Sequence, residues 1–142
     1  MLTNILLIRP VIRIIMRLHI AIYRNTKGKI FGSVQGRRVI LLTTTGRNTG
    51  MFHTVPLGAA KEGKNYVVVA SNGGRDHHPS WFLNILCQSE AVLEVGEEVM
   101  TVRAVQMHGS ESERLGLLLP WLERYTKRTT RQIPVVLLQK VL

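Results

Sequence analysis

Six short runs of β-branched and aliphatic residues, most of them bounded by glycine-containing turns, limit what this 142-residue chain can fold into. They lie at residues 39–42, 54–60, 66–70, 90–95, 99–107 and 133–139. Runs of this length separated by turns predict strands joined as hairpins. Helical segments are predicted between them, at residues 79–87 and 110–126, the second bent at Pro120. We therefore expect an α+β fold, a small barrel of about six mainly antiparallel strands with inserted helices.

No repeat or low-complexity tract divides the chain, and its length suits a single core. We distinguish an N-terminal basic helix and linker, residues 1–36, from a barrel domain at residues 37–142. The single cysteine, Cys87, excludes an internal disulfide and suits a reducing cytosol. Because Cys87 falls in an apolar helical stretch, we expect a buried thiol.

The net positive charge arises in one part of the sequence. Residues 1–61 contain ten Lys and Arg and no acid, whereas residues 62–142 contain nine of each sign, so the formal +10 arises before residue 62. This asymmetry indicates an anionic partner, which could be a membrane surface, a nucleic acid or a polyanionic cofactor. Nucleic acid is disfavoured, because the basic segment carries no recognition motif.

Residues 4–24 predict an amphipathic helix with an arginine stripe. Successive arginines are four, four and seven residues apart, which places them on one face; they are Arg9, Arg13, Arg17 and Arg24. The arginines argue against a membrane span. Two interpretations stay open: contact with an anionic membrane surface, or packing on a partner subunit or on the chain's own core. We accordingly expect a cytoplasmic protein, either free or peripheral on the inner face of the cell membrane, and leave a homodimer open.

The stretch from Thr43 to Gly50 follows the first strand and combines glycines, hydroxyl side chains and Arg47. Backbone N–H groups, hydroxyls and a guanidinium suit a phosphate or carboxylate. A polar hairpin with glycines for turn geometry is the alternative. The five histidines lack metal-ligand spacing, so we predict no metal site.

A second candidate site runs from Ser71 through Asn72-Gly73-Gly74 to His78-Pro79-Ser80-Trp81. A loop of small residues at a strand end, followed by a helix N-terminus with an aromatic, can receive a planar ring with an anionic tail. The alternative is a tight turn before a helix that packs Trp81 inward. No residues here carry out bond-making chemistry alone, so an enzyme of this kind needs a cofactor.

Five ordered motifs resemble the deazaflavin (F420)-dependent nitroreductase family. They are Leu41-Leu42-Thr43-Thr44-Thr45-Gly46-Arg47 with Thr49-Gly50, Thr54-Val55-Pro56-Leu57, Val68-Val69-Ala70-Ser71-Asn72-Gly73-Gly74, His78-Pro79 with Trp81 and Leu83-Asn84-Ile85, and Ile133-Pro134-Val135-Val136. The resemblance covers about residues 37–140 and implies a split β-barrel that binds coenzyme F420. That cofactor is an 8-hydroxy-5-deazaflavin with a phosphate and an oligoglutamate tail.

The resemblance also implies roles for individual residues. The phosphate and tail would meet Arg47, Asn48 and Thr49, and the cofactor would continue along His53, Thr54, Val55, Pro56 and Leu57. The ring would lie near Ala70, Ser71, Asn72, Pro79, Trp81 and Asn84, with Ser71 and Tyr125 as catalytic residues. The chain departs from the family at Asn48, where lysine is usual, and at Gly58 and Leu122, where tyrosines line the acceptor pocket.

The activity implied is hydride transfer from the reduced deazaflavin to a small-molecule electron acceptor, either a quinone-like or a nitroaromatic compound. The alternative is a non-catalytic carrier of a lipid or of the cofactor on the same barrel.

Overall fold

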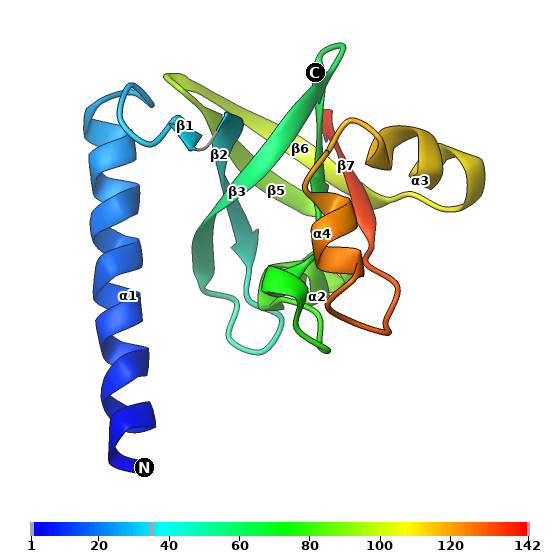
Figure 1. Ribbon diagram of the computed structural model, residues 1–142. Helices are drawn as coiled ribbons and strands as arrows, with labels where there is room; N and C mark the ends of the chain where they lie inside the picture. Colours follow the sequence, from blue (N-terminus) through cyan, green and yellow to red (C-terminus); the bar gives the residue numbers. More distant parts are fainter. Residues whose placement is uncertain (1, 35, 142) are drawn as a thin grey trace.

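The computed structural model of the protein describes residues 2–34 and 36–141, with side chains from residue 8 onward, and shows a β-barrel flanked by helices (Figure 1). The strands are β1 Ser33–Val34, β2 Arg37–Thr45, β3 Phe52–Glu62, β4 Asn65–Val69, β5 Glu90–Val95, β6 Glu98–Gln106 and β7 Val135–Lys140. They are paired in the order β1-β2-β3-β4-β7-β6-β5, all antiparallel, and β5 also pairs with β2. That last pairing closes six strands, β2 to β7, into the barrel. The predicted α+β barrel is confirmed.

The extra strand β1 lies in the segment predicted as an irregular linker. Ser33 pairs with Arg38 and Val34 with Arg37 at the start of β2. A strand of two residues is too short to produce a periodic sequence signal, so the pattern missed it.

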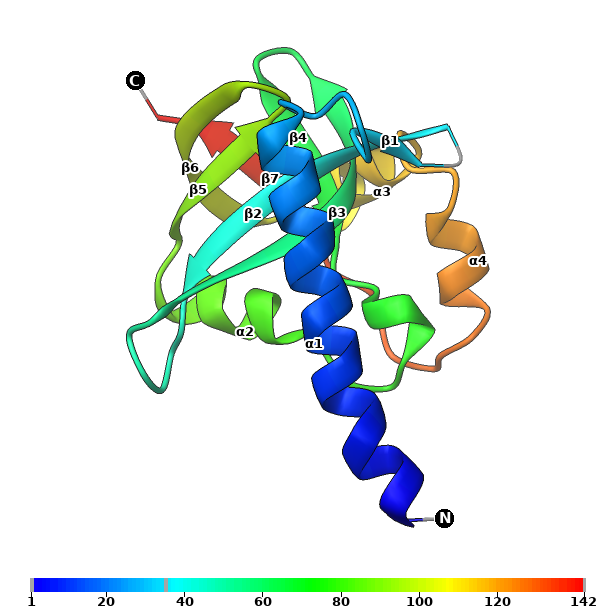
Figure 2. The same cartoon turned by 90° about the vertical axis from the view of Figure 1, so that its left-hand side faces the viewer.

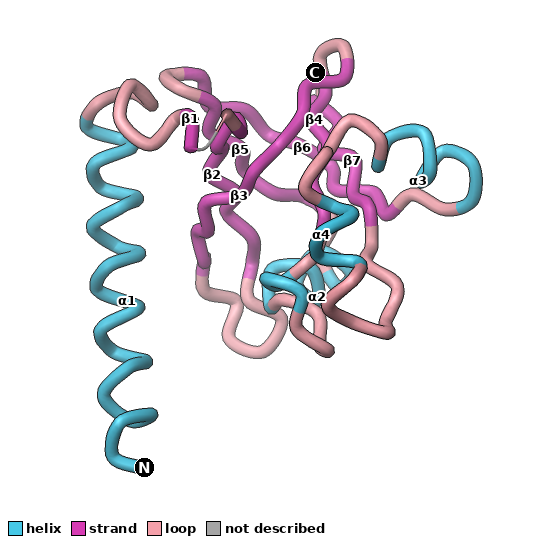
Figure 3. The backbone as a smooth tube through the Cα atoms, in the orientation of Figure 1, coloured by secondary structure: helices cyan, strands magenta, loops and turns pink. Residues whose placement is uncertain are grey.

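The barrel interior is filled by alternate residues of the strands, because neighbouring side chains of a strand point to opposite faces. Members of this core include Ile40, Leu42, Val68, Leu93, Val102 and Leu138, together with Trp81 and Phe82 from helix α2 Ser80–Cys87. The helix lies at one end of the barrel (Figure 3). Cys87 ends this helix with an exposed side chain, so the predicted burial of its thiol is wrong.

The segment predicted as one bent helix at residues 110–126 forms two helices, α3 Gly109–Gly116 and α4 Leu122–Thr126. Pro120 lies between them and has no N–H to continue the helical hydrogen bonds, so the bend becomes a break. The segment packs Leu115, Leu119 and Trp121 on the outside of the sheet, against Val67 and Val135.

Helix α1 Leu2–Asn25 stands beside the barrel and is anchored by its C-terminal turn (Figures 1 and 2). The Tyr23 side chain is 1% exposed. Its hydroxyl donates to the Val39 carbonyl at 3.0 Å and accepts from the Gly96 N–H at 2.9 Å. Next to it, Arg24 binds the Glu94 carboxylate through Nε at 2.9 Å and Nη2 at 2.8 Å. These contacts fix which face of α1 is turned to the barrel.

The orientation of α1 places its arginines inward and its apolar side outward. Arg13 and Arg17 face the barrel, whereas Val11, Ile15 and Leu18 lie on the opposite face and are 51%, 57% and 59% exposed. None of the described helices is both long and apolar enough to span a bilayer.

Candidate functional site

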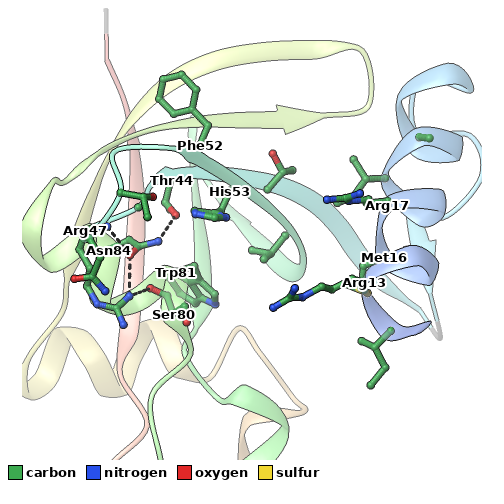
Figure 4. Close-up of a pocket in the computed structure, with 18 of the residues that line it drawn as sticks. Arg13, Met16, Arg17, Thr44, Arg47, Phe52, His53, Ser80, Trp81 and Asn84 are labelled. Atoms are coloured by element: carbon green, nitrogen blue, oxygen red, sulfur yellow. Dashed lines mark hydrogen bonds between the residues drawn. The ribbon is translucent and has the colours of Figure 1, made fainter. Parts of the chain in front are cut away.

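A cavity of about 890 Å³ lies between α1, the β2–β3 hairpin and the N-terminus of α2 (Figure 4). Its volume is within the range of small-molecule sites, roughly 300–1,000 Å³. The lining residues come from three separate parts of the chain, so only the folded protein assembles it.

The charged side chains that line this cavity are all basic. They are Arg13, Arg17, Arg24 and Arg47, accompanied by His53, and no Asp or Glu is among the lining residues. Arg24 is paired with Glu94, but Arg13, Arg17 and Arg47 form no ion pair with any carboxylate in the described part of the chain. Several uncompensated guanidinium groups around one space suit a ligand with more than one negative charge.

The loop between β2 and β3 is tightly folded at Gly46. The Gly46 N–H donates to the Met51 carbonyl at 2.7 Å, and the Gly50 N–H donates to the Gly46 carbonyl at 2.8 Å. A Cβ atom at Gly46 would lie 2.8 Å from Thr49 Oγ1 and 3.0 Å from His53 Nε2. Glycine at this position therefore lets Thr49 and His53 converge at the cavity wall.

Asn84 holds Arg47 in place from the neighbouring helix α2. Its side chain is 3% exposed, and its Oδ1 accepts from the Arg47 backbone N–H at 3.2 Å and from Arg47 Nη1 at 2.9 Å. Its Nδ2 donates to Thr44 Oγ1 at 3.1 Å. Arg47 Nη1 also contacts the Ser80 carbonyl at 3.4 Å. One edge of the guanidinium is thus anchored, while its other donors stay available to a ligand.

Eight of the predicted cofactor-binding residues line this cavity: Arg47, Asn48, Thr49, His53, Thr54, Val55, Trp81 and Asn84. Pro56 and Leu57 lie further along β3 and are not among its lining residues. The structure therefore gathers the glycine loop and the start of α2 around one space, as the sequence motifs suggested.

The other predicted ring-binding residues, Ala70, Ser71, Asn72 and Pro79, lie in the segment that leads into α2, outside the cavity lining. Arg131 fixes this segment: its Nη2 donates to the Ala70 and Ser71 carbonyls at 3.0 Å each, and its Nε donates to the Arg75 carbonyl at 2.8 Å.

Arg131 also determines which ring nitrogen of His78 carries the proton and contributes to the lowered pKa of this residue. Its Nη1 lies 3.0 Å from His78 Nδ1, and because a guanidinium only donates, Nδ1 accepts and the neutral ring carries its proton on Nε2. Burial, and secondarily the charge of Arg131, lower the pKa of His78.

Tyr125, the second predicted catalytic residue, is on α4 and also outside the cavity lining. Its hydroxyl accepts from Arg37 Nη1 at 3.2 Å. The Arg37 guanidinium also lies 4.8 Å from the centre of the Trp121 ring. A Cβ at Gly58 would be 3.1 Å from that ring, so Trp121 occupies the space that a side chain at Gly58 would need.

Sequence reasoning missed the contribution of α1 and of Arg131. The α1 residues that line the cavity are Ile12, Arg13, Met16, Arg17, Ile20, Ala21 and Arg24. The sequence showed by their spacing that they share a helix face. It did not show that this face is turned toward the barrel. Arg131 had no sequence signal, since its partners lie 53 to 61 residues away. Among the described residues, no group of His, Cys, Asp and Glu could hold a metal ion.

A family model and a related sequence indicate the same family. The family model described as "F420H(2)-dependent quinone reductase" matches residues 15–140. An F420H(2)-dependent quinone reductase of Mycobacterium tuberculosis (strain ATCC 25618 / H37Rv) is 37% identical over 134 residues, covering 89% of this chain and 90% of the relative.

Two solved structures with more than 30% sequence identity share the fold. An F420-H2 dependent reductase (FDR-A) matches with a TM-score of 0.66 and 33% identity, covering 71% of this chain and 93% of that chain. A structure described as a domain-swapped dimer matches with a TM-score of 0.67 and 31% identity, covering 80% and 90%. These findings confirm the resemblance to F420-dependent barrel enzymes: the chain belongs to the F420H(2)-dependent quinone reductase family.

Proposed function

We propose that this protein is an oxidoreductase that uses reduced coenzyme F420 to reduce a quinone-type small molecule. The observation that carries the proposal is a cavity lined by three arginines without an ion-pair partner and by no acid among the described residues, in a chain of this family. Coenzyme F420, when bound, supplies the hydride. Its phosphate and carboxylates match the donors that line the cavity. A quinone that accepts one hydride and one proton becomes a hydroquinone, so the protein has to bind, orient and supply a proton.

The phosphate end of the cofactor is assigned to the β2–β3 loop. Arg47, fixed by Asn84, offers its free guanidinium donors, and Asn48 and Thr49 add an amide and a hydroxyl. His53, Thr54 and Val55 extend this wall along β3, followed by Pro56 and Leu57. Because Arg47 is already held before the ligand arrives, little side-chain entropy is lost on binding.

The deazaflavin ring is assigned to the region around Trp81 and the start of α2. The segment from Ala70 to Pro79 approaches this point and is fixed by Arg131 through two adjacent carbonyls. A segment held in this way orients a ring reproducibly. This favours hydride transfer, which requires close and aligned reactants.

Tyr125 and Ser71 are the candidate proton donors. Because the Tyr125 hydroxyl accepts a hydrogen bond from Arg37, its own hydrogen remains available to an acceptor. Tyr125→Phe should therefore lower kcat by about 100-fold with little change in cofactor affinity. An unchanged kcat would remove Tyr125 from the mechanism.

The proposal is tested by fluorescence titration of the purified protein with F420, with FMN in parallel, followed by turnover assays. We expect F420 to bind with a roughly micromolar or lower Kd and reduced F420 to be oxidised by quinones, with nitroaromatic compounds as a second acceptor class. Arg47→Ala should weaken F420 binding, while Arg103→Ala, a matched exposed arginine outside the cavity, should not. Binding without turnover on any acceptor would instead favour a carrier of the cofactor.

We also propose that the protein works in the cytoplasm at the inner face of the membrane, held by the outward side of α1. Val11, Ile15 and Leu18 are more than half exposed there. An exposed apolar helix face fits the bilayer interface, where a long-chain quinone resides. Ile15→Glu with Leu18→Glu should abolish flotation with anionic vesicles. If the double variant floats as well as the unchanged protein, or if it alone becomes monomeric, the face serves another purpose, such as a homodimer.

A further inference from the structure

Arg13 and Arg17 form a short row of positive charge on the cavity side of α1. They are one helical turn apart, about 6 Å along the axis. Both side chains extend from α1 toward the space in front of His53 and Trp81 (Figure 4). They face the β2–β3 loop, which carries Arg47, so the cavity has a basic wall on each side.

The two arginines differ from Arg24, which continues the stripe toward the C-terminus of α1. Arg24 is neutralised by two hydrogen bonds to Glu94, and this ion pair anchors the helix. No carboxylate in the described chain offers Arg13 or Arg17 the same compensation. Arg24 therefore serves the fold, whereas Arg13 and Arg17 have their charges free.

The protein gains nothing in stability from directing these two charges into its own cleft. Like charges one turn apart on a helix repel each other, and the same orientation leaves Val11 and Leu18 exposed on the other side. An anionic ligand bound between the two walls would attract both arginines and so offset their mutual repulsion. Arginine is suited to the task because its planar fork binds a carboxylate through two parallel hydrogen bonds.

We propose that Arg13 and Arg17 bind successive carboxylates of the oligoglutamate tail of coenzyme F420, so that α1 is the outer wall of the tail site. This inference rests on the proposed function. In this arrangement Arg47 would hold the phosphate on the barrel side of the cavity, and Arg13 and Arg17 would bind the tail carboxylates on the α1 side. Each glutamate adds one carboxylate, so affinity depends on tail length only while Arg13 and Arg17 are present.

The test measures binding, not turnover. The full-length protein is titrated with F0, the deazaflavin without phosphate or tail, and with forms of F420 that carry no glutamate, a single glutamate or an extended tail. The variants are Arg13→Gln with Arg17→Gln and, as a matched loss of two exposed positive charges away from the cavity, Arg103→Gln with Lys140→Gln. Glutamine keeps a good helix propensity, so α1 is retained.

For the unchanged protein and the matched control, affinity should rise with tail length. In the Arg13/Arg17 variant, affinity for the extended tail should fall roughly 10- to 25-fold, at about 3- to 5-fold for each arginine. Its affinity for the form without glutamate should be unchanged. Arg13→Lys with Arg17→Lys should recover part of the loss, because lysine keeps the charge but not the fork.

Three results would overturn the inference. One is an unchanged dependence on tail length in the Arg13/Arg17 variant, which leaves the proposed function intact. Another is an unchanged dependence on tail length in a variant that also no longer binds anionic vesicles. This result would assign Arg13 and Arg17 to lipid headgroups. Failure of the unchanged protein to bind any F420 form would reject the proposed function itself, and this inference with it.

Discussion

Two substitutions of Asn84 test the hydrogen-bond network that holds Arg47. One measures what the network contributes to stability, and the other measures what it contributes to cofactor binding. Asn84 is 3% exposed and forms three hydrogen bonds, two from Arg47 and one to Thr44. Asn84→Ala removes all three and leaves buried polar groups without a partner. At about 0.5–1.5 kcal/mol for each bond, the free energy of unfolding should fall by about 2–4 kcal/mol.

Asn84→Asp retains the geometry but changes the charge. One carboxylate oxygen can accept from Arg47 as the amide oxygen does, and the other can accept from the Thr44 hydroxyl. We therefore expect the free energy of unfolding to stay within about 1 kcal/mol of the original value. If the phosphate binds the free edge of the Arg47 guanidinium, at an assumed separation of roughly 8 Å, the new negative charge would cost about 1–2 kcal/mol at an effective dielectric constant of about 20–40, which would weaken F420 binding about 5- to 30-fold.

Urea unfolding measures the change in the free energy of unfolding, and F420 fluorescence titration measures the change in cofactor affinity. Equal unfolding midpoints for Asn84→Ala and the unchanged protein would show that the network contributes no stability. If Asn84→Asp binds F420 as tightly as the unchanged protein, Arg47 does not face the anionic part of the cofactor.

Three further predictions concern other contacts. Tyr23→Phe, which leaves two backbone groups near β2 and β5 without their partner, should lower the free energy of unfolding by about 1–3 kcal/mol, as measured in urea. Arg131→Gln should speed amide hydrogen exchange of residues 70–78 while exchange in α3 is unchanged; equal protection at residues 70–78 would contradict its role. Because the pKa of His78 is lowered on folding, its contribution to stability is full above about pH 6.5 and is lost as the pH falls below that value. His78→Gln should flatten this part of the stability profile in urea titrations at several pH values.

The strands and the glycine loop were predictable because their signals are local. Residues 39–42, 66–70 and 90–95 alternate or cluster in ways that specify strands, and the glycines at 46 and 50 mark the turn that follows the first of them. The order of the motifs was enough to identify the family. Errors arose where the local signal was weak or ambiguous: β1 is only two residues long, and Pro120 breaks a helix that the pattern continued.

The sequence alone also determined that α1 has an arginine side and an apolar side, since a period of 3.6 residues follows from helix geometry. Which side meets the barrel was decided by the tertiary structure. Tyr23 and Arg24 bind residues 16 to 73 positions away, on β2, on β5 and in the turn after β5, which become neighbours only when β5 pairs with β2. In the same way, Asn84 meets Arg47, and Arg131 meets Ser71, only in the folded chain, because the partners lie 37 and 60 residues apart in the sequence. Periodicity fixes the faces of an element, whereas long-range contacts fix the direction in which each face points.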